Sequence, residues 1–412
     1  GVMTDRIPEG WRECKLGEAP LDIIDGDRGI NYPKQNEFNE TGYCLFLNTK
    51  NVTSNGFVFE ECYFITKEKD GKLGKGKLQK NDIVLTTRGT VGNIAFYSDA
   101  IPFNNIRINS GMVIIRPKIE QISPEYTYQL LKNLKYEYNI FATGSAQPQL
   151  PIRDLINIPI LLPPLPEQRA IASVLGSLDD KIDLLNRENQ TLEQMAEAIF
   201  RQWFIEEADE EWEEGSLLEL IELVGGGTPK TSIAEYWDGS IPWLSGKDIS
   251  SNHKTFVTDT EKMITEDGLN NSSTKILPKY ATIISARGTV GKYCLLAQPM
   301  AFSQTNYGIL PKIEGCFFFT YLLINHLVEE LRASAYGCVF DTITTSTFRD
   351  SEVPIPSNTE INEFEDSVSP FFQRICQNKM QIRTLEKLRD TLLPKLMSGE
   401  VRVRFTDSEV QK

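Results

Sequence analysis

Two stretches of the chain carry apolar side chains at alternating intervals of three and four residues, the spacing of the a and d positions of a heptad. They lie within 163–206 and 356–405 and align at a constant offset of 193 residues, as from Ile182 to Ile375. The spacing predicts one long helix in each stretch. The expected seam consists of Ile182, Leu185, Asn189, Leu192 and Ile199 in the first helix and of Ile375, Asn378, Ile382, Leu385 and Leu392 in the second.

A long helix with a single apolar stripe is not stable alone in water, so each helix needs a partner. If the two helices pair, chain connectivity makes them antiparallel, and about 38 residues at about 1.5 Å each give a spacer of roughly 57 Å. The alternative is that each helix packs on the core of its own domain. Asn189 and Asn378 favour pairing, because polar seam residues set the register of coiled coils.

The rest of the chain contains an internal sequence repeat with a period near 200 residues. The sequence RGTVG occurs at 88–92 and again at 287–291, and shorter echoes surround it. Trp11 and Leu16 return as Trp212 and Leu217, and an Arg-Asp pair precedes an aliphatic-Pro pair near the end of each half. Five consecutive identities at matching places indicate two copies of one domain.

Both copies are expected to be rich in β-structure, because short apolar runs alternate with Gly, Asn and Pro. Helices are expected over 124–137 and 317–332. The fold class predicted is α+β, with two β-rich mixed domains related by the repeat and two long antiparallel helices forming a coiled coil between them. The expected segments are a first domain at 1–162, a spacer helix at 163–206, a second domain at 207–355, a second spacer helix at 356–405 and a tail at 406–412.

The sequence LPPLPEQ at 162–168, which continues through IASVL at 171–175 to DDKI at 179–182, resembles the central conserved region of the specificity subunit of type I restriction–modification systems. The two RGTVG segments and the Thr-Gly-Ser stretch at 143–145 match the same family, and the resemblance covers essentially the whole chain. The second helix departs from the pattern, because PSNTE at 356–360 stands where the Pro-rich motif would be.

The resemblance implies a DNA-binding subunit without catalytic activity, in which each variable domain reads one half of a bipartite, gapped target in double-stranded DNA. It further implies that the paired helices hold the domains at a fixed separation and dock two methyltransferase (modification) subunits, which motor-nuclease (restriction) subunits can join. S-adenosylmethionine would be bound by the methyltransferase, so no cofactor is expected in this chain.

The composition is that of a soluble protein, with 40% hydrophobic and 24% charged residues. No run of about 18 apolar residues and no apolar signal segment are present, so we expect a cytoplasmic protein with no membrane partner. The net charge of −14 argues at first against a nucleic-acid partner. However, residues 163–214 carry 4 basic and 14 acidic groups, whereas residues 1–162 carry 19 of each. Net charge therefore does not decide the question.

Signatures of catalysis are missing from the sequence. There is no Asn/Asp-Pro-Pro-aromatic tetrapeptide of adenine methylation and no G-x-G-x-x-G fingerprint. Residues 71–78 fit G-x-x-x-x-G-K but end in Leu, where a nucleotide site needs Ser or Thr for Mg²⁺. The seven cysteines have no C-x-x-C spacing and only two histidines occur, so no metal site is expected.

Basic residues are the candidates for contacts with DNA phosphates. A cluster in the first domain is interleaved with glycines, and the alternative for it is a solvated flexible loop. The second domain has no equivalent cluster and offers scattered residues. The phosphate candidates are Lys67, Lys69, Lys72, Lys75, Lys77, Lys80, Arg88, Lys247, Lys254, Lys275, Lys279 and Arg287.

Base readout requires polar side chains that can reach the groove edges. Two stretches supply them at similar distances after the RGTVG segments, and the alternative for each is an ordinary polar connection. The candidates are Asn104, Asn105, Arg107, Asn109, Ser303, Gln304, Thr305 and Asn306. Arg88 and Arg287 are shared by both halves, which favours fold support or phosphate contact over base specificity.

Two other function classes remain open at the level of sequence. One is an enzyme with an unrecognised nucleotide or methyl-donor site, and the other is a purely structural coiled-coil scaffold. Two copies of a domain with divergent polar loops argue against the scaffold.

Overall fold

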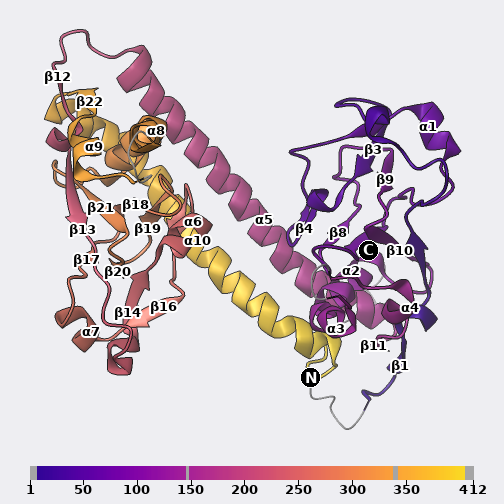
Figure 1. Ribbon diagram of the computed structural model, residues 1–412. Helices are drawn as coiled ribbons and strands as arrows, with labels where there is room; N and C mark the ends of the chain where they lie inside the picture. The colour runs from indigo at the N-terminus through magenta and orange to yellow at the C-terminus, as the bar shows by residue number, and fades with distance from the viewer. Residues whose placement is uncertain (1–6, 145–147, 337–341, 404–412) are drawn as a thin grey trace. The chain divides into compact units, whose positions relative to one another are not determined.

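The computed structural model describes residues 7–144, 148–336 and 342–403. The chain divides into two compact units, residues 1–180 with 386–412 and residues 181–385. Each unit contains one β-rich domain and part of both long helices. The α+β class and the expected long helices are confirmed (Figure 1).

The first domain contains small sheets of short strands. Its main sheet has the order β2-β10-β7-β8, and further sheets have the orders β1-β11, β6-β3-β9 and β4-β5. The strands are β1 Arg12–Lys15, β2 Leu21–Asp25, β3 Cys44–Leu47, β4 Val52–Thr53, β5 Gly56–Phe57, β6 Phe64–Ile65, β7 Ile83–Thr86, β8 Ile94–Phe96, β9 Ile106–Ile108, β10 Met112–Pro117 and β11 Pro159–Leu162. The helices are α1 Lys67–Lys72, α2 Pro124–Asn133, α3 Lys135–Phe141 and α4 Ile152–Leu155.

The second domain repeats this plan. Its sheets have the orders β13-β21-β18-β19-β15, β16-β14-β20-β17 and β12-β22. The strands are β12 Glu214–Ser216, β13 Ile221–Gly225, β14 Trp237–Leu244, β15 Phe256–Val257, β16 Lys262–Ile264, β17 Ile276–Leu277, β18 Thr282–Ser285, β19 Tyr293–Leu296, β20 Met300–Phe302, β21 Asn306–Pro311 and β22 Glu352–Pro354. The helices are α6 Gly246–Ser251, α7 Glu266–Asn270, α8 Phe317–Tyr336 and α9 Thr345–Arg349.

Strand register shows that the two domains are copies of one fold. In the main sheets Leu21 lies opposite Pro117, as Ile221 lies opposite Pro311. The parallel pair β3–β9 places Leu47 beside Ile108, and β14–β20 places Leu244 beside Phe302. The offset between the copies is close to 200 residues at β2 and β13 but 194 residues at β10 and β21. The connection between β8 and β9 is therefore longer in the first domain than its counterpart in the second.

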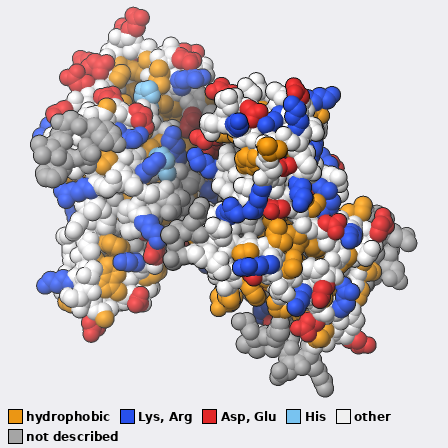
Figure 2. All heavy atoms as spheres, turned by 45° about the vertical axis from the view of Figure 1, so that its right-hand side comes forward, with side chains coloured by type: hydrophobic (Ala, Val, Ile, Leu, Met, Phe, Trp, Pro, Cys, Tyr) orange, Lys and Arg blue, Asp and Glu red, His pale blue; other side chains and the backbone are white. Residues whose placement is uncertain are grey.

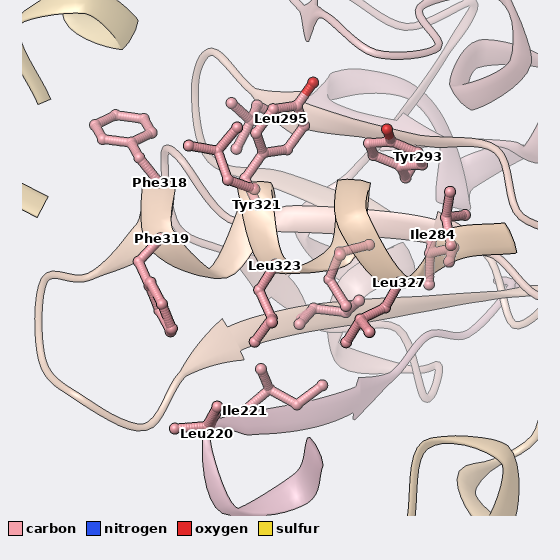
Figure 3. Close-up of a cluster of buried hydrophobic side chains, with 14 of the residues drawn as sticks. Leu220, Ile221, Ile284, Tyr293, Leu295, Phe318, Phe319, Tyr321, Leu323 and Leu327 are labelled. Atoms are coloured by element: carbon pink, nitrogen blue, oxygen red, sulfur yellow. The ribbon is translucent and has the colours of Figure 1, made fainter. Parts of the chain in front are cut away.

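Buried apolar side chains fill each domain between its main sheet and a helix. In the second domain, side chains from α8 such as Phe318, Leu323 and Leu327 lie among those of the strands, including Ile284 and Tyr293 (Figure 3). These residues belong to the clusters of buried apolar side chains that supply most of the stability of a fold.

The two long helices are α5 Leu165–Arg201, which ends in a π-helical turn over Gln202–Glu206, and α10 Asn358–Met397. A capping box forms at the start of α10. The Ser357 hydroxyl accepts from the backbone N–H of Glu360 at 3.3 Å, and the Glu360 carboxylate accepts from the N–H of Ser357 at 2.8 Å. At the other end Gly399 has φ 72°, the conformation that ends many helices.

Equivalent tryptophans tie the start of each long helix to its domain. The indole N–H of Trp11 donates to the Glu167 carboxylate at 2.9 Å, and that of Trp212 donates to Glu360 at 3.2 Å. The first of these carboxylates also accepts from the guanidinium of Arg402 at 2.5 and 2.8 Å. The repeat therefore includes the join between domain and helix.

The two helices are antiparallel, because residues that come later in α5 contact residues that come earlier in α10. In the first unit Asp179 of α5 accepts from Arg389 of α10 at 3.1 Å. In the second unit Asn189 accepts from Asn378 at 2.8 Å, and these amides are 3% and 1% exposed. Pairing of the helices, as predicted from the heptads, is confirmed.

The predicted seam positions fall into two environments. Ile182, Leu185, Ile382 and Leu385 pack together between the helices. Leu192 and Ile199 pack on the core of the second domain, to which Ile375 belongs, and Leu392 packs on the core of the first. The alternative of packing on the domain cores is therefore realised toward the helix ends, and pairing is realised between them.

Candidate nucleic-acid interface

The RGTVG segments form tight turns that join β7 to β8 and β18 to β19. Gly89 and Gly92 have φ of 72° and 90°, and Gly288 and Gly291 both have φ of 80°. L-residues rarely adopt this conformation, which explains the glycines at both places in each copy. We call residues 88–92 and 287–291 the Arg-Gly turns.

A polar segment lies beside each Arg-Gly turn. The backbone N–H of Thr87 donates to the carbonyl of Gly111 at 2.8 Å, and that of Ala286 donates to Thr305 at 3.0 Å. These segments, residues 109–111 and 303–305, immediately precede or enter the central strands β10 and β21. Strand pairing thus fixes the position of the polar segment relative to the turn in both domains.

A third loop meets the polar segment in each domain. A Cβ on Gly26 would lie 2.3 Å from the carbonyl oxygen of Asn109, and a Cβ on Gly226 would lie 2.2 Å from that of Ser303. Only glycine allows this approach, and both glycines directly follow an equivalent strand, β2 or β13. We call residues 26–31 and 226–231 the tip loops, and the tip loop, polar segment and Arg-Gly turn together the loop face.

The tip loop of the first domain is fixed by one carboxylate. Asp27 accepts from the backbone N–H groups of Gly29 and Gly74, both at 2.7 Å, and of Lys75 at 3.4 Å. The bond from Gly29 is the main cause of the lowered pKa of Asp27. Arg28 and Arg88 line the same pocket of about 230 Å³, so the tip loop and the Arg-Gly turn share a surface.

The lysine-rich segment is not the flexible loop considered above, because its first part is the helix α1. Thr66 caps this helix by accepting from the N–H of Lys69. Several of its lysines have partners. Lys69 pairs with Glu37 at 2.9 Å, Lys72 with Glu68 at 2.6 Å and Lys77 with Asp70, while Lys80 donates to the carbonyl of Ser98 at 3.0 Å.

Lys67, Lys75 and Lys80 are the members of the cluster for which no carboxylate partner is found among the described residues, and the ammonium of Lys80 is bonded to the Ser98 carbonyl. Lys67 is exposed and its ammonium lies 5.6 Å from the ring centre of Tyr43. Lys75 is exposed next to the tip loop. In the space-filling view, Lys and Arg side chains are spread over the visible face of the first unit, the unit without histidine (Figure 2).

The basic candidates of the second domain are exposed and scattered. Lys247 pairs with Glu261 at 2.7 Å, and the Lys279 ammonium lies 4.7 Å from the ring centre of Tyr280. Lys254, Lys275 and Arg287 are exposed, and within the described part of the chain none of them has a carboxylate partner. Arg287 stands on the loop face, as Arg88 does in the first domain.

Among the base-readout candidates, Arg107 is in the wrong environment. Its side chain is 5% exposed and lies on β9. It donates to the Asp70 carboxylate at 2.6 Å and to the carbonyls of Asp70, Leu73 and Lys75. All of its donor groups are thus used inside the protein, and it holds the lysine-rich segment on the sheet. The register places Ala301 at the equivalent position.

The other candidates divide according to the longer connection between β8 and β9. Counting from the Arg-Gly turn pairs Asn104 with Ser303, but strand register pairs Asn109 with Ser303. Asn109 and Thr305 therefore lie on the loop faces, whereas Ser303 lies beneath the surface there, 6% exposed, with its hydroxyl bonded to Thr305. Asn104 and Asn105 belong to the extra length of the connection, and Asn105 accepts from the N–H of Leu45. Asn306 is buried and donates to Ser303 at 2.7 Å, whereas Gln304 is exposed.

The tip loops were missed by sequence reasoning. A signal for them existed, because the echo of Trp11 and Leu16 at Trp212 and Leu217 is followed by a glycine at nearly the same distance, Gly26 ten residues after Leu16 and Gly226 nine residues after Leu217. Other site classes receive no support: the described residues contain no group of three or more His, Cys, Asp or Glu arranged to hold a metal. Nor does the described part of the chain include a helix with the length and apolar character to cross a membrane.

Comparison with known proteins gives matches along nearly the whole chain. The family model described as type I restriction modification DNA specificity domain matches twice, at residues 8–194 and 209–386. The HindI specificity subunit of Haemophilus influenzae is 25% identical over 95% of this chain and 99% of its own length. The MjaIX specificity subunit of Methanocaldococcus jannaschii is 28% identical over 79% of this chain and 78% of its own.

A solved structure has the same fold. The S subunit of a type I restriction-modification system from M. genitalium superimposes with a TM-score of 0.63 at 17% sequence identity, and the match covers 98% of both chains.

Proposed function

Because the chain belongs to the family of type I restriction–modification specificity subunits, whose members recognise DNA and are not catalytic, we propose that its two domains read the two halves of a gapped target in double-stranded DNA. Each domain would contact DNA through its loop face. The observation that carries this proposal is the convergence of the same three segments, on the same strand register, in both domains.

The loop faces combine a constant frame with variable side chains. The frame is the pair of Gly contacts at Gly26 and Gly226 and the two Arg-Gly turns. The side chains on that frame differ, with Ser110 in one domain where the exposed Gln304 stands in the other, while Asn109 is matched by the buried Ser303. A reader of two different half-sites needs such a combination, because base discrimination depends on the side chains presented to the groove.

Phosphate contact fits the basic residues on or near the loop faces that have no carboxylate partner among the residues that the structure describes. In the first domain these are Arg88 and Lys75, and in the second Arg287 is the clearest candidate. Lys77 and Lys69 fit this role less well, because their ammonium groups neutralise Asp70 and Glu37. Phosphate contacts position a protein on the duplex without specifying sequence.

The paired helices would set the gap and dock the methyltransferase. Each unit contains part of both helices, and interhelical contacts occur in each unit. A repeated helix–domain join offers two equivalent surfaces, which suits two modification subunits, and motor-nuclease subunits would add to that complex. The methyltransferase would bring the S-adenosylmethionine. Because its target would be DNA, we expect the protein to act in the cytoplasm, in the compartment that holds the genome.

The test is to express the chain with its cognate methyltransferase in a host without other DNA methylation and to sequence the modified genome. The proposal predicts a single motif of two short specific parts separated by a fixed number of unspecified bases. The variant Arg287→Ala is expected to lower occupancy without changing either part. Methylation at an ungapped motif, or none in cells that contain the assembled complex, would contradict the proposal.

A further inference from the structure

The tip loops carry different side chains at equivalent positions, four residues after the shared glycine. Ile30 occupies this position in the first domain and Lys230 in the second. Equivalence follows from β2 and β13, whose last residues Asp25 and Gly225 pair with β10 and β21 in matching register. The two loops therefore start from the same point on the same sheet.

Ile30 is 99% exposed, so the fold of the first unit makes no use of its side chain. A single exposed isoleucine is ordinary on a protein surface. This one stands on a loop that Asp27 fixes through three backbone N–H groups, and a turn closed by the N–H of Tyr32 on the carbonyl of Gly29 at 3.0 Å holds its backbone. A rigid loop thus presents an apolar side chain to solvent.

Basic residues lie near this apolar side chain in the chain and in the fold. Arg28, two residues earlier, is half-exposed and pairs with Asp25 at 3.1 Å, and the exposed Lys75 has its backbone held against the loop by Asp27. An apolar group flanked by cations suits a ligand that has an apolar patch between anionic groups. The major groove of DNA offers that pattern, because the 5-methyl group of thymine lies between the phosphate backbones.

Lys230 is also exposed on a fixed backbone. The indole N–H of Trp237 donates to its carbonyl at 3.3 Å, and the N–H of Ile233 donates to the same oxygen at 3.2 Å. Within the described residues its ammonium has no carboxylate partner. Lysine on a rigid loop is a donor for the O6 and N7 acceptors of guanine.

We infer that position 30 and position 230 are specificity-determining residues of the two domains. In this inference, which rests on the proposed function, Ile30 packs on a thymine methyl group in one half of the target and Lys230 donates to a guanine in the other half. The shared frame explains how one fold reads two different sequences by exchange of the side chain at a loop tip.

The experiment uses the complex with the cognate methyltransferase and compares genome-wide methylation for the unchanged chain, Ile30→Ala and Lys230→Ala. Matched controls are Ile119→Ala and Lys312→Ala, which are exposed and lie beyond the opposite ends of β10 and β21. Ile30→Ala is expected to relax one A·T position in one half of the motif, and Lys230→Ala one G·C position in the other half. The controls should leave the motif unchanged.

The contact with thymine has its own test. A duplex carrying the motif is compared with the same duplex in which one thymine, at the position that Ile30→Ala relaxes, is replaced by uracil, which lacks the methyl group. The unchanged complex should bind the second duplex about fourfold more weakly, the equivalent of one methyl-sized apolar contact. Ile30→Ala should bind both duplexes equally.

The outcomes separate the two proposals. If the unchanged complex gives no gapped motif, the proposed function fails and the inference fails with it. If the motif appears and both variants reproduce it, or both relax the same half, the inference alone is overturned. An equal response of Ile119→Ala or Lys312→Ala would overturn it as well.

Discussion

The two domains share a fold, but the equivalent strands β9 and β20 have different side-chain surroundings. In the first domain Arg107 on β9 is surrounded by Asp70, Lys77 and backbone carbonyls. In the second domain Ala301 on β20 packs with Ile241, Trp243 and Ile264. In the first domain the buried Arg107 thus holds the lysine-rich segment through charged and polar contacts. In the second domain apolar side chains pack around the equivalent residue. The same frame therefore tolerates very different chemistry close to the loop face.

The largest effect that follows is on stability. Arg107→Ala is expected to destabilise the first domain by about 3–5 kcal/mol, because it leaves the Asp70 carboxylate buried with fewer partners. Urea unfolding of the full chain measures it. Asp70→Ala added to Arg107→Ala should recover part of the loss, whereas a loss below about 1 kcal/mol for Arg107→Ala would show that the buried ion pair is not essential.

A second difference concerns pH. Burial raises the pKa of Glu365 in the second unit to about 7, despite N–H groups of Phe318 and Phe319 that donate to it. A carboxyl with a raised folded pKa stabilises below its unfolded value and loses that contribution as pH rises to about 7. Glu365 is expected to contribute up to about 1.4 kcal/mol per pH unit to the slope between pH 5 and 7. Unfolding of Glu365→Gln should show a flatter profile, and an unchanged slope would contradict the assignment.

The first domain should respond to pH in the opposite direction. Burial alone would raise the pKa of Asp70, but hydrogen bonds from Lys77 and Arg107 outweigh it and the pKa is lowered. The contribution of Asp70 is therefore present above about pH 4 and is lost as the solution becomes more acidic. Domain-resolved hydrogen exchange at pH 3 and pH 5 can compare the two domains.

The helix pair gives a fourth prediction, because its polar contacts differ between units. Asn378→Leu removes the bond to Asn189 and leaves that buried amide without a partner, at an expected cost of about 1–3 kcal/mol in unfolding experiments. The double variant Asn189→Leu with Asn378→Leu should recover most of this stability, since an apolar seam replaces both amides. A double variant less stable than the single one would show that the amides do more than satisfy each other.

The smallest effect is expected for single lysines on DNA. Lys75→Ala should reduce the slope of log affinity against log salt by about 0.9, the value for one phosphate contact. Lys72→Ala is the matched comparison, because its ammonium is paired with Glu68 at 2.6 Å and should change the slope less. Fluorescence anisotropy with a duplex lacking the motif measures both, and equal slopes for the two variants would remove Lys75 from the interface.

Much of the architecture could be predicted because it depends on periodic patterns. The heptads identified both long helices, and the repeated RGTVG identified two copies of a domain, since positive φ at two glycines leaves little freedom of sequence. The seam asparagines were found for the same reason. These features are local or periodic, so a single sequence reveals them.

The composition of the loop faces could not be predicted in full. Arg107 has the sequence context of an exposed polar stretch, and only the folded structure places it on β9 with its side chain buried against Asp70 of α1. Because the connection between β8 and β9 is longer than its counterpart, distance from the RGTVG segments aligns Asn104 with Ser303, whereas strand register aligns Asn109 with Ser303. The tip loops have no sequence motif of their own. What singles them out is a close backbone contact: a Cβ on Gly26 would lie only 2.3 Å from the carbonyl oxygen of Asn109.

The division of the chain into units has a consequence for its biosynthesis. Leu396 and Met397, at the end of α10, lie within the core of the first unit, whereas residues 181–385 form the other unit without interruption. On the ribosome the middle of the chain can therefore complete its fold while the N-terminal domain still awaits the end of α10. The domain that is translated first has to avoid aggregation during that interval.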